Sequence, residues 1–253
     1  MRHWQTQNWL GVALDLLVVI AGILIGLRID AWRDNVQDRE DEVGYLERLL
    51  DEAEANHHAL DEVLERMWYR REQGRNALER LLSGEPLATD ERARTVDALV
   101  HAGELPKPAI VNGTYEELIS TGRMPIVQDQ ELRILLTRQI AVHGQVAAQA
   151  DTYRAALLEA QPLSDRHAIL SGEATAEGVE LGKAYDLASL RTDNQALVTF
   201  FNQIEASEDF SAQREAEREA VAAVRDRLRC SLRRASCSDR ASGLEDARQG
   251  AAL

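Results

Sequence analysis

An apolar stretch near the N-terminus is the strongest feature of the hydrophobic pattern. Residues 9–32 are WLGVALDLLVVIAGILIGLRIDAW, and no polar side chain occurs from Leu16 to Leu27. As a helix the stretch is roughly 34 Å long, which is close to the hydrocarbon thickness of a bilayer. Tryptophans, which prefer the headgroup level, stand at both ends at positions 4, 9 and 32. The pattern predicts a transmembrane anchor helix over residues 9–32, preceded by a short tail at residues 1–8.

A cleaved signal peptide and a buried helix of a soluble core are the two alternatives to an anchor. A signal peptide ends in a small-x-small cleavage site, whereas Arg28, Asp30 and Trp32 follow the apolar run here. Asp15 inside the apolar stretch is also unusual for a signal peptide, and it slightly favours the buried helix. The length and the aromatic ends favour a retained anchor.

Three glycines and one acid align along one face of this helix. At 100° per residue, Gly11, Asp15, Gly22 and Gly26 fall within an arc of about 60°. Gly22 and Gly26 have the G-x-x-x-G spacing that lets two membrane helices approach backbone to backbone. We therefore predict a helix–helix contact in the membrane through these four residues, with Asp15 protonated or paired across it. The alternative is that the glycines are ordinary membrane-helix residues and that Asp15 reaches headgroup water.

Beyond the anchor, apolar positions recur in alternating steps of four and three over about five heptads. The positions of this seam are Leu46, Leu50, Ala53, His57, Leu60, Leu64, Met67, Arg71, Gly74, Leu78 and Leu81. Because a histidine, an arginine and a glycine interrupt the seam, we interpret it as one stripe of a helical bundle or antiparallel coiled coil. The pattern predicts a long helix over residues 34–82 that continues from the anchor and ends before Ser83–Pro86.

Residues 90–128 contain turn and capping signals and are expected to form a small helical cap. A short helix is predicted from about residue 90 to residue 101, followed by a connector that contains Pro106 and Pro108. Thr114 and Glu117 have the spacing of a capping box, which predicts a second short helix that Gly122 closes.

Two further long helices are predicted at residues 129–163 and 193–234. Asp129 is placed to cap the first, and Thr192 and Gln195 form a capping box before the second. Residues 164–186 are rich in glycine and are predicted to be a loop with a helical turn, and residues 238–253 are expected to be disordered. The expected fold is all-α, with an N-terminal transmembrane helix continuing into a long helix and an extramembrane helical domain over residues 33–237.

Composition narrows the classes of partner. The formal net charge is −14 and no basic patch stands out, so nucleic acid is not an expected partner. Aromatic residues make up 5% of the chain, and the abundance of Ala, Leu, Glu and Arg is typical of long helices. Cys230 and Cys237 would lie about 10.5 Å apart on one continuous helix, so a disulfide requires that helix to end near Arg234. The sequence leaves open whether the two are thiols or a disulfide.

Motifs for catalysis or cofactor binding are absent from the sequence. There is no Walker loop, nucleophile elbow, H-E-x-x-H or dinucleotide fingerprint. His57 shares a helix face with Glu54 and Asp61, where a metal site is conceivable, but a polar break in the seam is the better interpretation. His143 lies on an apolar stripe and is expected to be a core histidine. We therefore predict no catalytic, cofactor-binding or metal-binding residue.

Two blocks of sequence resemble a bacterial family of single-pass membrane proteins of unknown function. The first is LLVVIAGILIGLRIDAW, where the family usually has Glu at the position of Asp15 and Ala at the position of Gly26. The second is TYEELISTGRMPIVQDQELRILL, Thr114 to Leu136, which is similar to the family's Leu-Ile-Ser-x-Gly turn and acid-rich helix start. The resemblance implies the same order of elements and no particular activity.

Two arguments predict opposite orientations of the chain in the membrane. The resemblance implies a bacterial inner-membrane protein with its N-terminus in the cytoplasm and its large domain in the periplasm. The Lys and Arg count implies the opposite, because Arg28 and Arg33 follow the apolar run that ends at Leu27, whereas only Arg2 precedes it. We expect a periplasmic domain on the resemblance.

Three functional hypotheses follow from the sequence. The first is a membrane-anchored interaction protein without catalysis, which self-associates or docks on a membrane complex through the anchor stripe and the seam. The second is a helical ligand-binding sensor domain that acts through a partner. The third is an enzyme of unknown type, for which no nucleophile can be named. The expected partners are the lipid bilayer and a second copy of the chain or another membrane protein.

Overall fold

The computed structural model describes residues 9–101, 103–175 and 178–233, although some side chains in these ranges are not described, mainly before residue 36 and in the hairpin. The described chain is mostly helical, which confirms the predicted fold class at that level. The helices are α1 (Trp9–Ser83), α2 (Thr89–His101), α3 (Gly113–Ser120), α4 (Gln130–Ser164), α5 (Leu187–Leu190) and α6 (Asn194–Arg233). Short 3-10 turns are η1 (Met124–Ile126) and η2 (Asp165–His167). The predicted tails at residues 1–8 and 238–253 lie outside the described residues.

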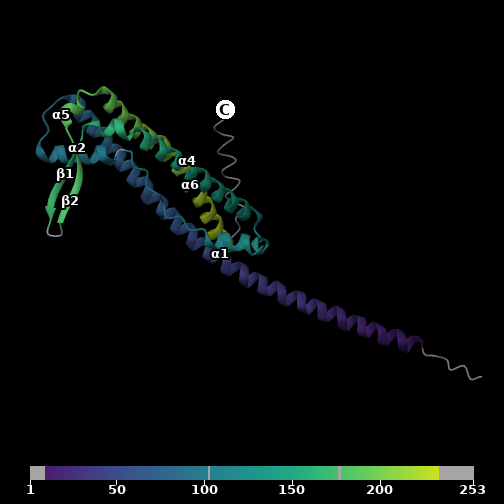
Figure 1. The fold of residues 1–253 in the computed structure, drawn as a ribbon. Helices are drawn as coiled ribbons and strands as arrows, with labels where there is room; N and C mark the ends of the chain where they lie inside the picture. Colours follow the sequence, from purple (N-terminus) through teal and green to yellow (C-terminus); the bar gives the residue numbers. More distant parts are fainter. Residues whose placement is uncertain (1–8, 102, 176–177, 234–253) are drawn as a thin grey trace, which may run out of the picture.

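Three long helices, α1, α4 and α6, form an elongated bundle (Figure 1), in which α6 packs against both of the others. The helices α1 and α6 are antiparallel, because Glu54 pairs with Arg229 at one end and Arg75 pairs with Glu205 towards the other. The N-terminal part of α1 continues alone, well beyond the bundle (Figure 1). Within the part of the chain that the structure describes, no helix is both long enough and apolar enough to cross a membrane.

The apolar core is divided along the bundle into three clusters. The cluster closest to the projecting part of α1 joins α1, α4 and α6, and includes Leu49, Leu132 and Leu228. The middle cluster includes Met67, Val146 and Phe210. The third cluster, at the far end of the bundle, joins the end of α1 to α2, α5 and the start of α6, and includes Leu81, Leu99, Leu190 and Phe200. The bundle therefore has a near end, where α1 projects, and a far end, where the short elements gather.

A β-hairpin occupies most of the segment that the sequence predicted to be a loop, so that prediction is wrong. Strand β1 (Ala168–Thr175) pairs antiparallel with β2 (Gly178–Tyr185), with Ala168 opposite Tyr185. The hairpin extends from the far end of the bundle (Figure 1). Its base is fixed there because Tyr185 is buried in the far cluster and packs edge-on against Phe200, with ring centroids 5.7 Å apart.

The helices α3, α4 and α6 begin within about one residue of the predicted positions, but the predicted capping hydrogen bonds form in only one of these three cases. Asp129 caps α4 as predicted, and its carboxylate accepts a hydrogen bond from the backbone N–H of Leu132 at 3.1 Å. The capping box at Thr192 is wrong, because Asp193 caps α6 by accepting from the backbone N–H groups of Gln195 and Ala196.

The predicted capping box at Thr114 and Glu117 is also wrong, because both residues form hydrogen bonds with side chains of α1 instead of with each other's backbone. The N–H and hydroxyl of Thr114 each donate to the Glu52 carboxylate at 2.8 Å. Glu117 accepts hydrogen bonds from Tyr45 and Arg48 instead of reaching back to its own helix. The N-cap of α3 is Asn112, and its side chain makes no capping hydrogen bond. Gly122 follows the helix with φ at 68°, as expected of a closing glycine.

Candidate functional site

The predicted anchor stripe lies on the projecting part of α1. Gly11, Asp15, Gly22 and Gly26 are all within this helix, but the side-chain position of Asp15 and the surroundings of Gly11 and Gly26 lie outside the described residues. A methyl group added at Gly22 would meet no atom within 4 Å. No element of the described chain therefore covers the stripe at Gly22, and the predicted helix–helix contact stays a prediction.

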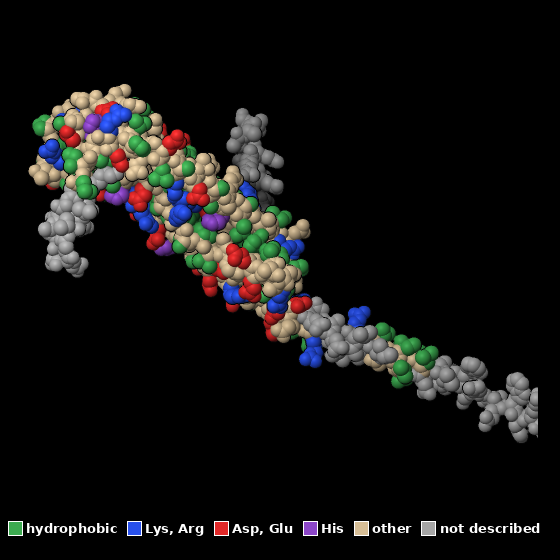
Figure 2. All heavy atoms as spheres, viewed as in Figure 1, with side chains coloured by type: hydrophobic (Ala, Val, Ile, Leu, Met, Phe, Trp, Pro, Cys, Tyr) green, Lys and Arg blue, Asp and Glu red, His purple; other side chains and the backbone are tan. Residues whose placement is uncertain are grey.

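Aliphatic side chains on this part of α1 are exposed all the way round the helix. Leu16, Leu17, Val18 and Val19 follow one another, and each is between 58% and 63% exposed. Four successive residues at 100° per residue sample the whole circumference of a helix. No face of α1 is therefore buried here, whereas a surface helix of a soluble domain buries one stripe. Figure 2 shows hydrophobic side chains on the rod that extends from the bundle.

The predicted seam faces the interior of the bundle. Leu46, Leu60, Met67, Leu78 and Leu81 are buried, and Leu50 and Leu64 are half-buried. The helix α1 packs mainly against α6 and, near its end, against α2 of the same chain, so the structure accounts for the burial of the seam without a second copy. The heptad interpretation missed Leu49, Val63 and Asn56, which are buried on the adjacent positions of α1.

A cluster of polar contacts fixes the second sequence block, Thr114 to Leu136, to the near end of α1. Tyr45 donates to Glu117 at 2.8 Å, and Arg48 donates to the same carboxylate at 2.8 Å. The hydrogen bonds from Arg48 and then from Tyr45 lower the pKa of Glu117 below its ordinary value. Arg123 forms an ion pair with Asp41 and also donates to the hydroxyl of Tyr45 at 3.2 Å. The block thus docks where α1 leaves the bundle.

Asp129 connects the same block to the last turns of α6. It accepts hydrogen bonds from Arg227 at 2.6 Å and from the hydroxyl of Ser231 at 3.0 Å, besides capping α4. Partial burial raises the pKa of Asp129, but the bonds from Arg227, the Leu132 N–H and Ser231 together outweigh it and lower that pKa. The carboxylate therefore holds the ends of two long helices together.

An open cavity of about 410 Å³ lies at the opposite, far end of the bundle. It is bounded by α2, the connector after it, α4, α6 and the end of β2. Its volume is at the lower end of the range typical of small-molecule sites. Six apolar side chains form most of its wall: Leu99, Val100, Leu105, Leu157, Leu158 and Phe200.

Polar side chains in the cavity wall are already engaged with other groups, with one exception. Tyr185 donates to Asp165 at 3.1 Å, and burial followed by the charge of Asp165 raises the pKa of Tyr185. Gln161 also donates to Asp165. Arg154 donates to Asp151 at 2.7 Å, and Glu104 forms an ion pair with Arg70.

The exception is Gln203, which is half-buried and has no hydrogen-bond partner among the described residues. Its side-chain amide carbon would lie 3.5 Å from a methyl group added at Gly103. The Gln203 amide is therefore close to the connector that forms one edge of the cavity.

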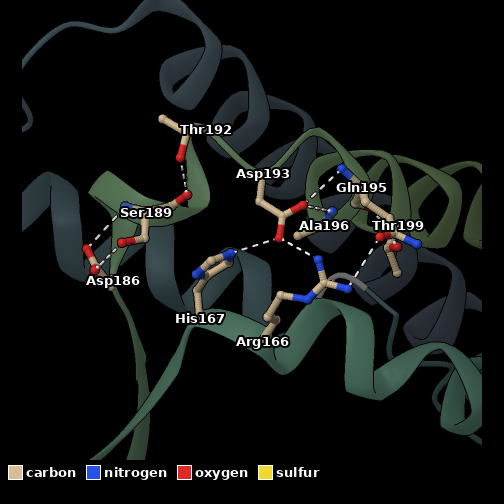
Figure 3. Close-up of polar contacts among 9 residues, drawn as sticks. All are labelled: Arg166, His167, Asp186, Ser189, Thr192, Asp193, Gln195, Ala196 and Thr199. Atoms are coloured by element: carbon tan, nitrogen blue, oxygen red, sulfur yellow. Dashed lines mark hydrogen bonds and ion pairs between the residues drawn. The ribbon is translucent and has the colours of Figure 1, made fainter.

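A second polar group, centred on Asp193, lies at the base of the hairpin (Figure 3). Asp193 accepts hydrogen bonds from Arg166 and His167, each at 2.9 Å, and from the N-terminal N–H groups of α6. The bond from His167, followed by that from the Ala196 N–H, lowers the pKa of Asp193 to about 2. Ser189 bonds to Asp186 rather than to His167, so the group has no activated nucleophile and serves to fix the turn before α6.

Histidines with nearby acids are accounted for by pairing within the bundle. His57 pairs with Asp61 at 2.9 Å, and Glu54, the third member of the predicted group, pairs with Arg229. Across the described residues there is no group of three or more possible metal ligands. His143 lies in a half-buried position and contacts the buried carboxylate of Glu217 at 2.6 Å.

Sequence reasoning missed the cavity and the buried ionic pair of α6. The cavity brings together between one and four residues from each of several segments that are far apart in the chain, and no local motif marks them. Arg214 and Glu217 are 2% and 1% exposed and pair at 2.5 Å. A signal for this pair exists in the sequence, because Phe210, Arg214, Glu217 and Val221 continue one four-and-three pattern on α6, with two charged residues at its apolar positions.

Cys230 is disulfide-bonded, which the sequence left open. The helix α6 ends at Arg233, before the other cysteine of the chain, Cys237, which lies outside the described residues.

Comparison with known proteins adds no relative. No protein-family model, no curated protein and no solved structure matches the chain. The resemblance to a family of single-pass membrane proteins therefore stays a prediction.

Proposed function

We propose that the chain is a membrane-anchored interaction protein, held in a bilayer by residues 9–32 and self-associating or docking on a membrane complex through its anchor stripe. The observation that carries the proposal is the ring of exposed aliphatic side chains from Leu16 to Val19 outside the bundle. A helix that is apolar on every face is stable only when another apolar medium surrounds it. The sequence of the whole stretch supports a bilayer as that medium, because Asp15 is its one charged residue from Trp9 to Leu27.

Asp15 and the three glycines support a contact between helices within the bilayer. A carboxylate facing lipid is costly, and this cost falls when the side chain faces another helix and shares a hydrogen bond. At Gly22 a neighbouring backbone could approach closely, since nothing in the chain occupies that space. A second copy of the chain satisfies both requirements by symmetry.

The test is the mass of the detergent-solubilised protein, measured by light scattering. We expect the wild type to be a multimer and Gly22→Leu to be a monomer, because leucine side chains separate the two backbones. Gly44→Leu is the matched control, since Gly44 is an exposed glycine on the same helix with no atom near its added methyl group. A wild-type monomer, or a multimer that persists in both Gly22→Leu and Asp15→Leu, would refute self-association through the stripe.

Membrane attachment and orientation need a separate measurement. We propose a bacterial inner-membrane location with the helical domain in the periplasm. The disulfide at Cys230 supports this side, because such bonds persist in oxidising compartments. Protease added to intact spheroplasts should digest a periplasmic domain and leave a cytoplasmic one protected. Recovery of the whole chain in the soluble fraction would contradict the anchor itself.

A ligand-binding sensor is the second candidate function, and the cavity at the far end of the bundle favours it. The cavity lies between α4 and the connector after α2, and polar groups interrupt its apolar wall. Such a mixture is typical of small-molecule sites. The sensor would act through a partner.

A further inference from the structure

We propose that the far-end cavity binds an uncharged amphipathic small molecule, with a flat or branched apolar body and one hydrogen-bonding group. The proposal rests on the second candidate function, ligand binding, and assigns the chemical class of the ligand. It follows from the apolar wall, from the pairing of every charged group in that wall, and from one unpaired amide.

The apolar wall selects the body of the ligand. Leucine and valine side chains from α2 and α4, together with Phe200 of α6, line the cavity. Phe200 is fixed in place, because it is fully buried and its ring packs edge-on with Tyr185. A flat ring or a branched aliphatic group removes the most apolar surface from water in a space of this shape.

The charged groups of the wall disfavour a charged ligand. Glu104 is paired with Arg70, and Arg154 is paired with Asp151. The carboxylate of Asp165 accepts hydrogen bonds from Tyr185 and Gln161. A ligand with a net charge would lose hydration on entry, and the charged groups of the wall already have hydrogen-bond or ion-pair partners, which leaves little opposite charge to offset that loss. An uncharged ligand avoids this cost.

Gln203 supplies the complement to the hydrogen-bonding group. Its amide can donate two hydrogen bonds and accept two, so it suits a hydroxyl, a carbonyl or an amide equally well. It has no partner among the described residues, so a ligand would satisfy a half-buried polar group rather than compete for one. The position beside Gly103 places this amide at the edge of the apolar wall.

Three probes with one body and different charge test the proposal: 2-naphthol, 2-naphthoate and 2-naphthylmethylammonium. Each is titrated into the full-length protein in detergent, with binding followed by isothermal calorimetry and with detergent alone as the blank. We expect 2-naphthol to bind about tenfold or more tightly than either ion. Equal or tighter binding of an ion overturns the uncharged class, while ligand binding itself stands. If none of the three probes binds, both the uncharged class of the ligand and ligand binding by the cavity are overturned.

Substitutions locate the binding in the cavity. Leu157→Trp should abolish binding of 2-naphthol, because the indole fills the space, whereas Ile134→Trp should not. Both residues are on α4, but Ile134 is exposed and outside the cavity wall. Circular dichroism checks folding, and Leu158→Trp at the exposed rim replaces Leu157→Trp if that variant does not fold. Binding that persists in the folded tryptophan variant overturns the site.

The role of Gln203 has its own readout. Naphthalene lacks the hydroxyl of 2-naphthol, so the ratio of their affinities measures the hydrogen bond. We expect a ratio of about five to ten in the wild type and near one in Gln203→Leu. An unchanged ratio overturns the assignment of the hydrogen bond to Gln203.

Discussion

Replacing Glu217 with alanine should destabilise the bundle by about 3–5 kcal/mol, because it leaves a buried arginine without its carboxylate. Glu217 and Arg214 are both nearly inaccessible to water, and their side chains pair at 2.5 Å. The carboxylate also contacts the His143 ring at 2.6 Å. Arg214 has few other partners: its guanidinium lies over the ring of Phe210, and its Nε has no hydrogen-bond partner among the described residues.

The expected loss of unfolding free energy follows from the unpaired charge of Arg214 that remains after the substitution. Removing one member of a buried pair leaves the other charge desolvated, at a cost of several kcal/mol, whereas replacing both members with apolar side chains of similar size is often neutral. The double variant Arg214→Met with Glu217→Leu should therefore lie within about 1 kcal/mol of the wild type. His143→Ala should cost about 1–2 kcal/mol, because it removes one hydrogen bond to a charged group from a ring that is 31% exposed.

Urea unfolding followed by far-UV circular dichroism, in one detergent for all variants, measures these free energies. Arg218→Ala is the matched control, because Arg218 follows Glu217 on α6 and also pairs with a carboxylate, Asp61 of α1, but these two side chains are 39% and 45% exposed. Exposed pairs contribute about 0–1 kcal/mol. If Glu217→Ala and Arg218→Ala destabilise the protein equally, burial is not the source of the effect. A double variant less stable than Glu217→Ala would refute the reasoning from desolvation.

Two further predictions concern acid stability and core packing. The pKa of Asp193 is about 2 in the folded protein, below its ordinary 3.8, so its stabilising effect is present above about pH 4 and is lost as the pH falls towards 2. The unfolding free energy of Asp193→Asn should therefore change less than that of the wild type between pH 4 and pH 2. The free energies are measured by urea unfolding at each pH, and an equal change with pH in the two proteins would contradict the prediction. Phe210→Ala should cost about 3–5 kcal/mol and Phe201→Ala less than about 1 kcal/mol, because the first ring is fully buried and the second is 52% exposed. Equal thermal shifts in the two variants would contradict the assigned core.

Long apolar patterns predicted the helices well, because they extend over many turns. The alternation from Leu46 to Leu81 identifies the side of α1 that faces the bundle, although Leu49 and Val63 show that the buried stripe is wider than one seam. Asp129 was identified as a cap from its local sequence, and the structure confirms it because its neighbours in the helix supply the donors. The cap forms although Arg227 and Ser231 of α6 also donate to Asp129, because its carboxylate can accept these bonds and the bond from the Leu132 N–H together.

Distant groups explain the failures. Thr114 and Glu117 have the spacing of a capping box, but Glu52 and Arg48 of α1, more than 60 positions away in the chain, bind them instead. The hairpin was missed because its strands contain glycine, alanine and glutamate, and these residues have low strand propensity. Its pairing and its contact through Tyr185 with α6 become visible only in three dimensions. The cavity is hidden from sequence for the same reason.

The pairing of the first long helix with the last sets the order of events during synthesis. The apolar side of α1 is complete when Ser83 leaves the ribosome, but its main partner, α6, begins only at Asn194. At roughly 5–20 residues per second, α1 waits on the order of ten seconds with its leucines uncovered. Contacts between such distant segments also close slowly, because the chain between them must first lose its freedom. The nascent chain is thus exposed to aggregation in this interval, until α6 covers the apolar side of α1.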